Sequence, residues 1–241
     1  MGKSGRRQAA EALRRQREAE ARRKKIVFGV AIGGAVVLIG GLLGLGIWMN
    51  REPDYEVNEP AAATTDSYAV RLGSGPTEID IYLDYLCPAC NQFESTYAES
   101  IQGWLDEGAV TVNYHPIAIL DRLSQNTAYS TRAAAAAVCA ADTGEQEFLD
   151  YTRALYEHQP PENTKGLGDE ELKEIGADVG LGADWEQCVD DETYKGWVRA
   201  GTESATGEQE VTGTPTVKLG GEKVEPADFA EEVESAIANA S

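Results

Sequence analysis

The residues whose types and spacing most directly suggest chemistry are two cysteines in the motif Cys87-Pro88-Ala89-Cys90. They follow a run with the two-residue alternation of a β-strand, residues 77–86, and precede a plausible helix. If Cys87 ends the strand-to-helix turn and Cys90 lies in the first helical turn, the two thiols share one face and suit a disulfide. Backbone N–H groups at a helix N-terminus favour the thiolate. The motif therefore predicts redox chemistry, with Cys87 as nucleophile and Cys90 as resolving thiol.

Two other interpretations of this cysteine pair are a structural disulfide and half of a zinc site. Tetrahedral zinc would need two further ligands at suitable spacing, and Cys139, Cys188, His115 and His158 show no local pairing in the sequence. We therefore expect dithiol redox chemistry, without a metal and without a cofactor.

The N-terminal part of the chain predicts a membrane anchor. Residues 26–49 are 24 uncharged residues, and a helix of that length rises about 36 Å, enough to cross a ~30 Å hydrocarbon core. Residues 1–25 carry ten Lys or Arg and three Glu, so the positive-inside rule places this basic arm in the cytoplasm and everything after residue 49 outside. A cleaved signal peptide is the alternative, but its apolar core would be shorter, and Ala61-Ala62-Ala63 lies a dozen residues downstream.

The charge distribution separates the arm from the rest of the chain. The whole chain carries −20 and the arm +7, so the remaining residues carry −27. A strongly acidic exported part argues against a nucleic-acid partner, which would require a basic surface. Residues 50–66 lack periodicity and read as a spacer, which leaves residues 67–241 for one domain. All four cysteines lie in this exported part, where disulfides persist.

The exported part shows alternating strand and helix patterns. Two strands, a helix and a third strand come first, then a helical block over about 121–209, and finally a hairpin and a helix. This order predicts an α/β sandwich with an inserted helical subdomain. The expected elements are strands 67–72, 77–86 and 109–116, a helix at 88–107, hairpin strands 216–219 and 222–224, and a last helix at 226–239.

From residue 67 to 240 the chain resembles the DsbA-like branch of the thioredoxin superfamily, membrane-anchored thiol-disulfide oxidoreductases of the bacterial envelope. Three segments carry the resemblance: Val70-Arg-Leu-Gly73, Leu83-Asp-Tyr-Leu-Cys-Pro-Ala-Cys90 and Gly213-Thr-Pro-Thr216. The resemblance implies a thioredoxin-like fold and a cis bond between Thr214 and Pro215. It also implies that this pair faces the two cysteines and contacts the substrate.

The resemblance further implies partners and a direction. Substrates would be exported cysteine-containing proteins that acquire disulfides, and a DsbB or vitamin K epoxide reductase-like membrane protein would reoxidise the dithiol. The same residues could instead serve a disulfide reductase or isomerase, because the reduction potential and the partner decide the direction. A non-catalytic binding module with a thioredoxin-like fold is a further alternative.

Two positions depart from the family pattern. Many members have a buried acidic residue six positions before the nucleophile, where this chain has Ile81, flanked by Asp80 and Asp84. Strong oxidants of the family often have histidine before the second cysteine, where this chain has Ala89. A thiolate with less support from its neighbours predicts a potential more reducing than that of the strongest oxidants.

Cys139 and Cys188 are 49 residues apart in the helical block. We interpret them as a structural disulfide across the insert, which stabilises by restricting the unfolded chain. A second redox pair, or pairing of each with a motif cysteine, are the alternatives.

Overall fold

The computed structural model describes residues 40–41, 55–64 and 67–240, and residues from Asp54 to Ser241 form one compact unit. The predicted basic arm at residues 1–25 lies outside the described residues. So does the predicted anchor at 26–49, apart from Gly40 and Gly41, which are helical. No helix among the described residues has the length and apolar character needed to span a bilayer. Arm and anchor therefore stay predictions.

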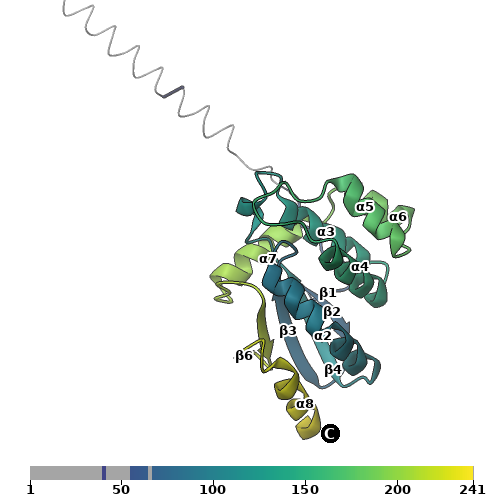
Figure 1. The fold of residues 1–241 in the computed structure, drawn as a ribbon, viewed down its shortest axis with the longest axis vertical. Coiled ribbons are helices and arrows are strands. Elements are labelled where there is room, and N and C mark those ends of the chain that lie inside the picture. The colour runs from purple at the N-terminus through teal and green to yellow at the C-terminus, as the bar shows by residue number, and fades with distance from the viewer. Residues whose placement is uncertain (1–39, 42–54, 65–66, 241) are drawn as a thin grey trace, which may run out of the picture. The chain divides into compact units, whose positions relative to one another are not determined.

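A six-stranded mixed sheet forms the centre of the unit, in the order β1-β2-β4-β3-β5-β6 (Figure 1). Strands β3 and β4 are parallel, and the other neighbouring pairs are antiparallel. Ile79, Ile81 and Leu83 of β3 are buried, which explains the alternation in the sequence. The strands are β1 (Ala63–Thr64), β2 (Ala69–Gly73), β3 (Thr77–Leu83), β4 (Val110–Pro116), β5 (Thr216–Leu219) and β6 (Glu222–Val224).

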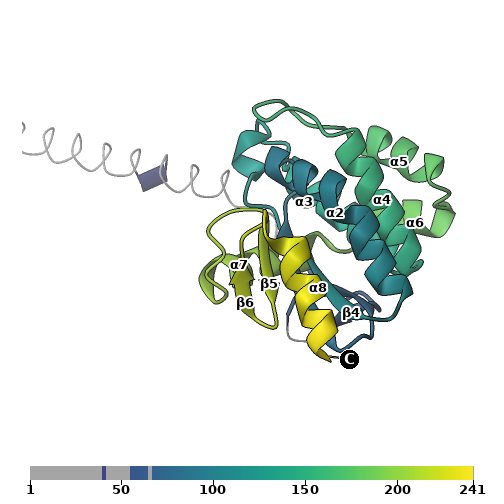
Figure 2. The ribbon, with the colours of Figure 1, turned by 60° about the horizontal axis from the view of Figure 1, so that its bottom comes forward.

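Two helices, α2 (Pro88–Asp106) and α8 (Phe229–Ala240), cross the same face of the sheet (Figure 2). Phe229 is the aromatic centre of their contact, because its ring centroid lies 5.1 Å from that of Phe93 and 5.7 Å from that of Trp104. Such edge-on and tilted pairs stabilise beyond the area they bury. Helices α2 and α8 therefore pack against each other through this aromatic cluster.

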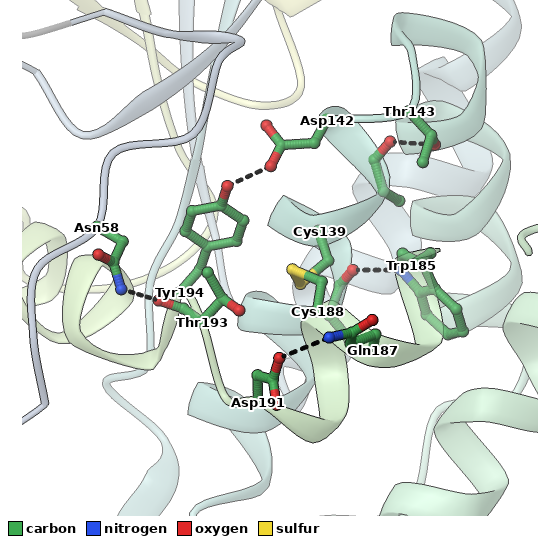
Figure 3. The surroundings of a disulfide bond; sticks show 12 residues. Asn58, Cys139, Asp142, Thr143, Trp185, Gln187, Cys188, Asp191, Thr193 and Tyr194 are labelled. Carbon is green, nitrogen blue, oxygen red and sulfur yellow. Dashed lines mark hydrogen bonds between the residues drawn. A yellow bond between two sulfur atoms is a disulfide. The ribbon is translucent and has the colours of Figure 1, made fainter. Parts of the chain in front are cut away.

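The helical block lies between β4 and β5 in the chain. Its central helix, α3, is buried along almost its whole length, and the run of alanines lets its neighbours approach closely. In α6, Trp185 donates a hydrogen bond from its indole Nε1 to the carbonyl oxygen of Ala136, at 3.0 Å (Figure 3). The elements of the block are η1 (Asp121–Leu123), α3 (Tyr129–Ala141), α4 (Glu145–Glu157), α5 (Asp169–Asp178), α6 (Ala183–Asp190) and α7 (Lys195–Gly207).

Part of the segment that the sequence assigns to a spacer, residues 50–66, contacts the domain. Asn58 donates a side-chain hydrogen bond to the carbonyl oxygen of Thr193 at 3.1 Å, and the Ala61 N–H donates to the Asp142 carboxylate at 2.9 Å (Figure 3 shows the first). Residues 63–64 add strand β1 to the sheet. These contacts use backbone groups and single side chains, so the sequence shows no periodic pattern that would predict them.

Cys139 of α3 and Cys188 of α6 form a disulfide (Figure 3). Cys87 and Cys90 are free thiols. The bond joins two helices of the block across 49 residues of chain. The bond excludes pairing of either residue with a motif cysteine in this structure, and the structural role of the pair stays a prediction.

We predict that replacing both residues, Cys139→Ala with Cys188→Ala, lowers the free energy of unfolding by about 4 kcal/mol, the loop-closure value for a ring of this length. Denaturant unfolding of the wild-type and double-variant proteins, both with reduced motif cysteines, measures the difference. Reactivity of Cys87 toward a thiol reagent should stay within about twofold of wild type under native conditions, because the disulfide acts mainly on the unfolded chain. A variant that unfolds like the wild type but has lost its thiol reactivity would indicate a redox role for the pair instead.

Candidate active site

The strand that carries the motif ends three residues earlier than the sequence pattern suggests. Strand β3 stops at Leu83, and a turn leads into α2, with the Cys87 N–H donating to the carbonyl oxygen of Asp84 at 2.9 Å. Cys87 is the N-cap residue of α2 and Pro88 opens the helix, where its missing N–H is not needed. The Cys90 N–H donates to the Cys87 carbonyl oxygen at 3.1 Å. Both cysteines therefore lie in the first helical turn.

The segment before β5 faces this turn. The bond between Thr214 and Pro215 is cis, and the Cys87 thiol donates to the carbonyl oxygen of Thr214 at a sulfur–oxygen distance of 3.2 Å. Thr216, the first residue of β5, pairs with Tyr82 of β3, which fixes the loop beside the motif. The fold thus brings Cys87, Cys90 and the Thr214-Pro215 pair together, while Cys139 and Cys188 join helices of the block.

The surroundings of Cys87 favour its thiolate. A hydrogen bond from Cys90 lowers the pKa of Cys87 most; burial opposes it, and the Thr214 hydroxyl and the N–H groups of Cys90 and Ala89 add to the lowering, which takes the pKa to about 6. The Thr214 carbonyl acts in the other direction, because it accepts a hydrogen bond only from the protonated thiol. The donors to the charged form outweigh burial, so the pKa of Cys87 lies below its usual value. Cys87 is 7% exposed, against 1% for Cys90.

Cys90 has the opposite environment. Its side chain is 1% exposed, and burial raises its pKa well above the usual value, as do the hydrogen bond to Cys87 and the Cys87 charge. The two thiols of one motif are therefore unequal: Cys87 is a thiolate near neutral pH and Cys90 is not. This asymmetry suits Cys87 as the attacking or leaving sulfur and Cys90 as the protonated resolving thiol.

The side chain of Asp84 anchors the turn, although in the sequence it stands out only as a residue close to Ile81. Asp84 is fully buried. Its Oδ1 accepts hydrogen bonds from the Leu86 N–H at 2.9 Å and the Ser130 hydroxyl at 2.6 Å, and its Oδ2 accepts from the Leu120 N–H at 2.9 Å. Burial raises the pKa of Asp84 to about 7 although all three bonds lower it. These partners lie up to 46 residues away, so no local sequence signal could have found them.

Gln159, two residues after the end of α4, makes a second set of contacts that the sequence does not reveal. Its side-chain N–H groups donate to the carbonyl oxygens of Tyr85 and Cys87, each at 3.0 Å. Asn91 of α2 donates in turn to the Gln159 side-chain oxygen at 3.3 Å and to the Tyr156 carbonyl at 2.6 Å. The end of α4 is thereby tied to both sides of the motif.

The position six residues before the nucleophile, Ile81, is apolar and fully buried in the sheet. A different carboxyl group is buried near the motif: Glu94 lies one helical turn after Cys90 on α2 and is 3% exposed. Its Oε2 has no hydrogen-bond partner among the residues that the structure describes, and burial raises the pKa of Glu94 to about 7 against the opposing charge of Arg153.

Comparison with known proteins agrees with this arrangement. A thioredoxin family model matches residues 73–239, more than half of the chain. The chain belongs to the thioredoxin family.

Solved structures place it more narrowly. The reduced form of the disulfide bond oxidoreductase DsbG from Mycobacterium tuberculosis is 30% identical, with a TM-score of 0.62 over 74% of this chain and 94% of that one. Oxidised DsbA of M. tuberculosis is 32% identical, with a TM-score of 0.61 over 72% of this chain and 100% of that one. MdbA, a thiol-disulfide oxidoreductase from Actinomyces oris, is 26% identical, with a TM-score of 0.60 over 73% and 91%. This family member is therefore a DsbA-like protein, and the thioredoxin-like fold is confirmed.

One curated relative is matched over only part of its length. The serine/threonine-protein kinase PknE of M. tuberculosis is 32% identical over 128 residues, which are 52% of this chain and 23% of the kinase. The chain thus spans about a quarter of the length of the curated relatives that it matches. The match therefore concerns a segment of 128 residues in the two proteins and says nothing about the rest of the kinase.

We predict that Thr214→Val raises the pKa of Cys87 by about 1, because the hydroxyl donor to the thiolate is lost while shape and backbone carbonyl remain. Thiolate absorbance near 240 nm, followed against pH on the reduced protein, measures the change. Thr214→Ser keeps the hydroxyl and should titrate like the wild type. Equal pKa values of Cys87 in the Val and Ser variants would show that the Thr214 hydroxyl does not lower this pKa.

The lowered pKa of Cys87 also predicts a pH-dependent stability of the reduced protein. The folded-state pKa lies near 6, below that of the unfolded thiol, so this stabilisation is complete above about pH 9 and is lost as the pH falls through about 6. We expect the melting temperature of the reduced protein to fall, relative to the oxidised protein, between pH 8.5 and 5. The oxidised protein is the control, since it has no thiols at the motif. A difference that does not change with pH would contradict the assignment.

Proposed function

We propose that this DsbA-like protein catalyses disulfide exchange with exported cysteine-containing proteins outside the cytoplasmic membrane, most often by introducing disulfides. The observation that carries the proposal is the inequality of the two thiols: the pKa of Cys87 is lowered to about 6, while that of buried Cys90 is raised. The Thr214-Pro215 segment facing Cys87 supports it, as do the structural relatives described as thiol-disulfide oxidoreductases.

In the oxidising direction, the protein starts with a Cys87–Cys90 disulfide. A substrate thiolate attacks the Cys87 sulfur, the disulfide breaks, and Cys90 leaves as a thiolate that takes up a proton because of its raised pKa. A second substrate thiolate then attacks the substrate sulfur of the mixed disulfide, and Cys87 leaves as a thiolate. The substrate gains one disulfide and loses two electrons, which remain on the protein as its dithiol.

The direction follows from the stability of the final thiolate. A low pKa makes Cys87 a good leaving group and stabilises the reduced protein, which makes the protein an oxidant. A pKa of about 6 is nevertheless higher than the value of about 3.5 found in the strongest oxidants of this kind. The absence of a histidine at Ala89 is consistent with that difference. The reduction potential should accordingly lie between about −270 mV, typical of thioredoxin, and about −120 mV, typical of DsbA.

The membrane assignment rests on residues 1–49. The basic arm at 1–25 and the apolar run at 26–49 support a single-pass anchor with the domain on the extracytoplasmic side. An anchored domain could return its electrons to a neighbouring membrane protein. A DsbB or vitamin K epoxide reductase-like partner would accept the two electrons released when the Cys87 thiolate and the Cys90 thiol form their disulfide again, and the Cys90 proton would be released in the same step.

We predict that Cys90→Ala accumulates mixed disulfides with substrate at Cys87, because no second thiol of the motif remains to release it. The measurement is nonreducing electrophoresis with mass spectrometry of the trapped species in the native host envelope. Cys87→Ser is the matched control and should trap nothing and lose exchange activity. Complexes made of cytoplasmic proteins, or none at all, would count against the proposal, and a potential near that of thioredoxin would favour the reductase alternative.

A further inference from the structure

A cavity of about 370 Å³ lies between helices α2 and α4, beside the motif. Helix α2 contributes Asn91, Glu94 and Glu99 to its wall, and α4 contributes Arg153 and Glu157. Figure 2 shows these two helices side by side. The volume is more than twenty times the roughly 10–15 Å³ of cavity space that one water needs, so the cavity has room for a side chain.

The wall of the cavity is continuous with the redox site. Asn91 follows Cys90 directly and is held by its hydrogen bonds to the Tyr156 carbonyl and to Gln159. Gln159 in turn donates to the Cys87 carbonyl oxygen at 3.0 Å. A polypeptide whose cysteine is bonded to Cys87 therefore has this cavity within reach of its neighbouring residues.

Glu94 gives the cavity an unmet chemical requirement. Glu94 is 3% exposed and lines the cavity. Within the described part of the chain, its Oε2 has no hydrogen-bond partner. A buried acceptor without a donor costs free energy. This differs from Asp84, whose two oxygens accept three hydrogen bonds from the protein itself. Glu94 is thus the buried carboxyl group near the motif with an oxygen left for a ligand.

The charges around the cavity favour a cation. Glu94, Glu99 and Glu157 face one guanidinium, that of Arg153, which lies 3.9 Å from the Asp150 carboxylate on its own helix. Within the part of the chain that the structure describes, no three His, Cys, Asp or Glu side chains are grouped closely enough to hold a metal ion. Carboxylates spread in this way suit a charge on a long, flexible stem with several donors, such as lysine or arginine.

We propose that this cavity is a subsite for a basic side chain of the client polypeptide, occupied while the client cysteine reacts at Cys87. The inference rests on the proposed exchange function. A lysine ammonium in the cavity would donate to Oε2 of Glu94 and form a charge-assisted hydrogen bond. The acidic rim of Glu99 and Glu157 would attract the same charge during approach, an effect that salt weakens. The subsite gives the protein a preference among cysteines according to their basic neighbours.

The test compares short peptides with one cysteine and either lysine or glutamine at a single position, taken in turn from one to four residues on each side. Mixed-disulfide formation with the oxidised full-length protein in detergent is followed by rapid quench. For at least one position we expect the lysine peptide to react about tenfold faster at low salt, in line with one hydrogen bond to a charged group. The ratio should fall toward one in Glu94→Gln and, for charge screening, in 0.5 M NaCl.

Several variants keep the test interpretable. Glu157→Gln changes an exposed rim residue and should lower the lysine preference partly even if Glu94→Gln folds poorly. Arg153→Gln should raise the preference, because it removes the competing positive charge. Glu231→Gln is the matched control, because Glu231 is an exposed residue of α8 that does not line the cavity. This variant should leave the ratio of lysine to glutamine peptide rates unchanged.

The outcomes separate the subsite from the function. Equal rates for lysine and glutamine peptides at every position would overturn the subsite and leave disulfide exchange standing. A lysine preference that persists in both Glu94→Gln and Glu157→Gln would also overturn the subsite, since the lysine charge would then be recognised by other residues. Failure of the oxidised protein to react with any peptide would instead overturn the proposed function.

Discussion

The buried carboxyl group of Asp84 determines where strand β3 ends and helix α2 begins. Placing a carboxyl group in the core is unfavourable, and the raised pKa of Asp84 shows that burial outweighs its hydrogen bonds. The three donors that compensate come from the turn itself, from the loop at Leu120 and from Ser130 of α3. Because they converge on one group, the turn, the loop and the helical block are fixed to one another. The position of Cys87 at the start of α2 depends on that convergence.

The chemistry depends on a difference in environment between two residues of the same type. Cys87, at the N-terminus of α2, receives donors from Cys90, Thr214 and the backbone, which stabilise its negative charge. Cys90 lies deeper and meets the charge of Cys87, which disfavours a second negative charge. The negative charge of the Cys87 thiolate therefore disfavours ionisation of Cys90. The motif therefore supplies one good leaving group and one protonated thiol without any cofactor in this mechanism.

The sequence predicted the elements well where one face of a strand or helix is buried. Ile79 and Ile81 identified β3, and helix α2 lies within one residue of the predicted 88–107. The predicted strand at 77–86 was three residues too long, because Asp84 bends the chain through tertiary hydrogen bonds. Strand β1 was missed because two residues carry no period. Thr214 and its cis bond came from family resemblance, since spacing alone says nothing about a contact across 127 residues.

The helical block is part of the active site as well as an insertion into the sheet. Ser130 of α3 holds Asp84, the Tyr156 hydroxyl of α4 donates to the Asp84 carbonyl, and Gln159 after α4 donates to Tyr85 and Cys87. The Cys139–Cys188 bond connects α3 to α6, and residues 58 and 61 add hydrogen bonds to the block from the chain that precedes β2. These bonds act far from the sulfur chemistry, yet they restrain the helices that position it. The direct contribution of the block to the motif is therefore positional, because the hydrogen bonds of Ser130, Tyr156 and Gln159 hold the turn that ends in Cys87.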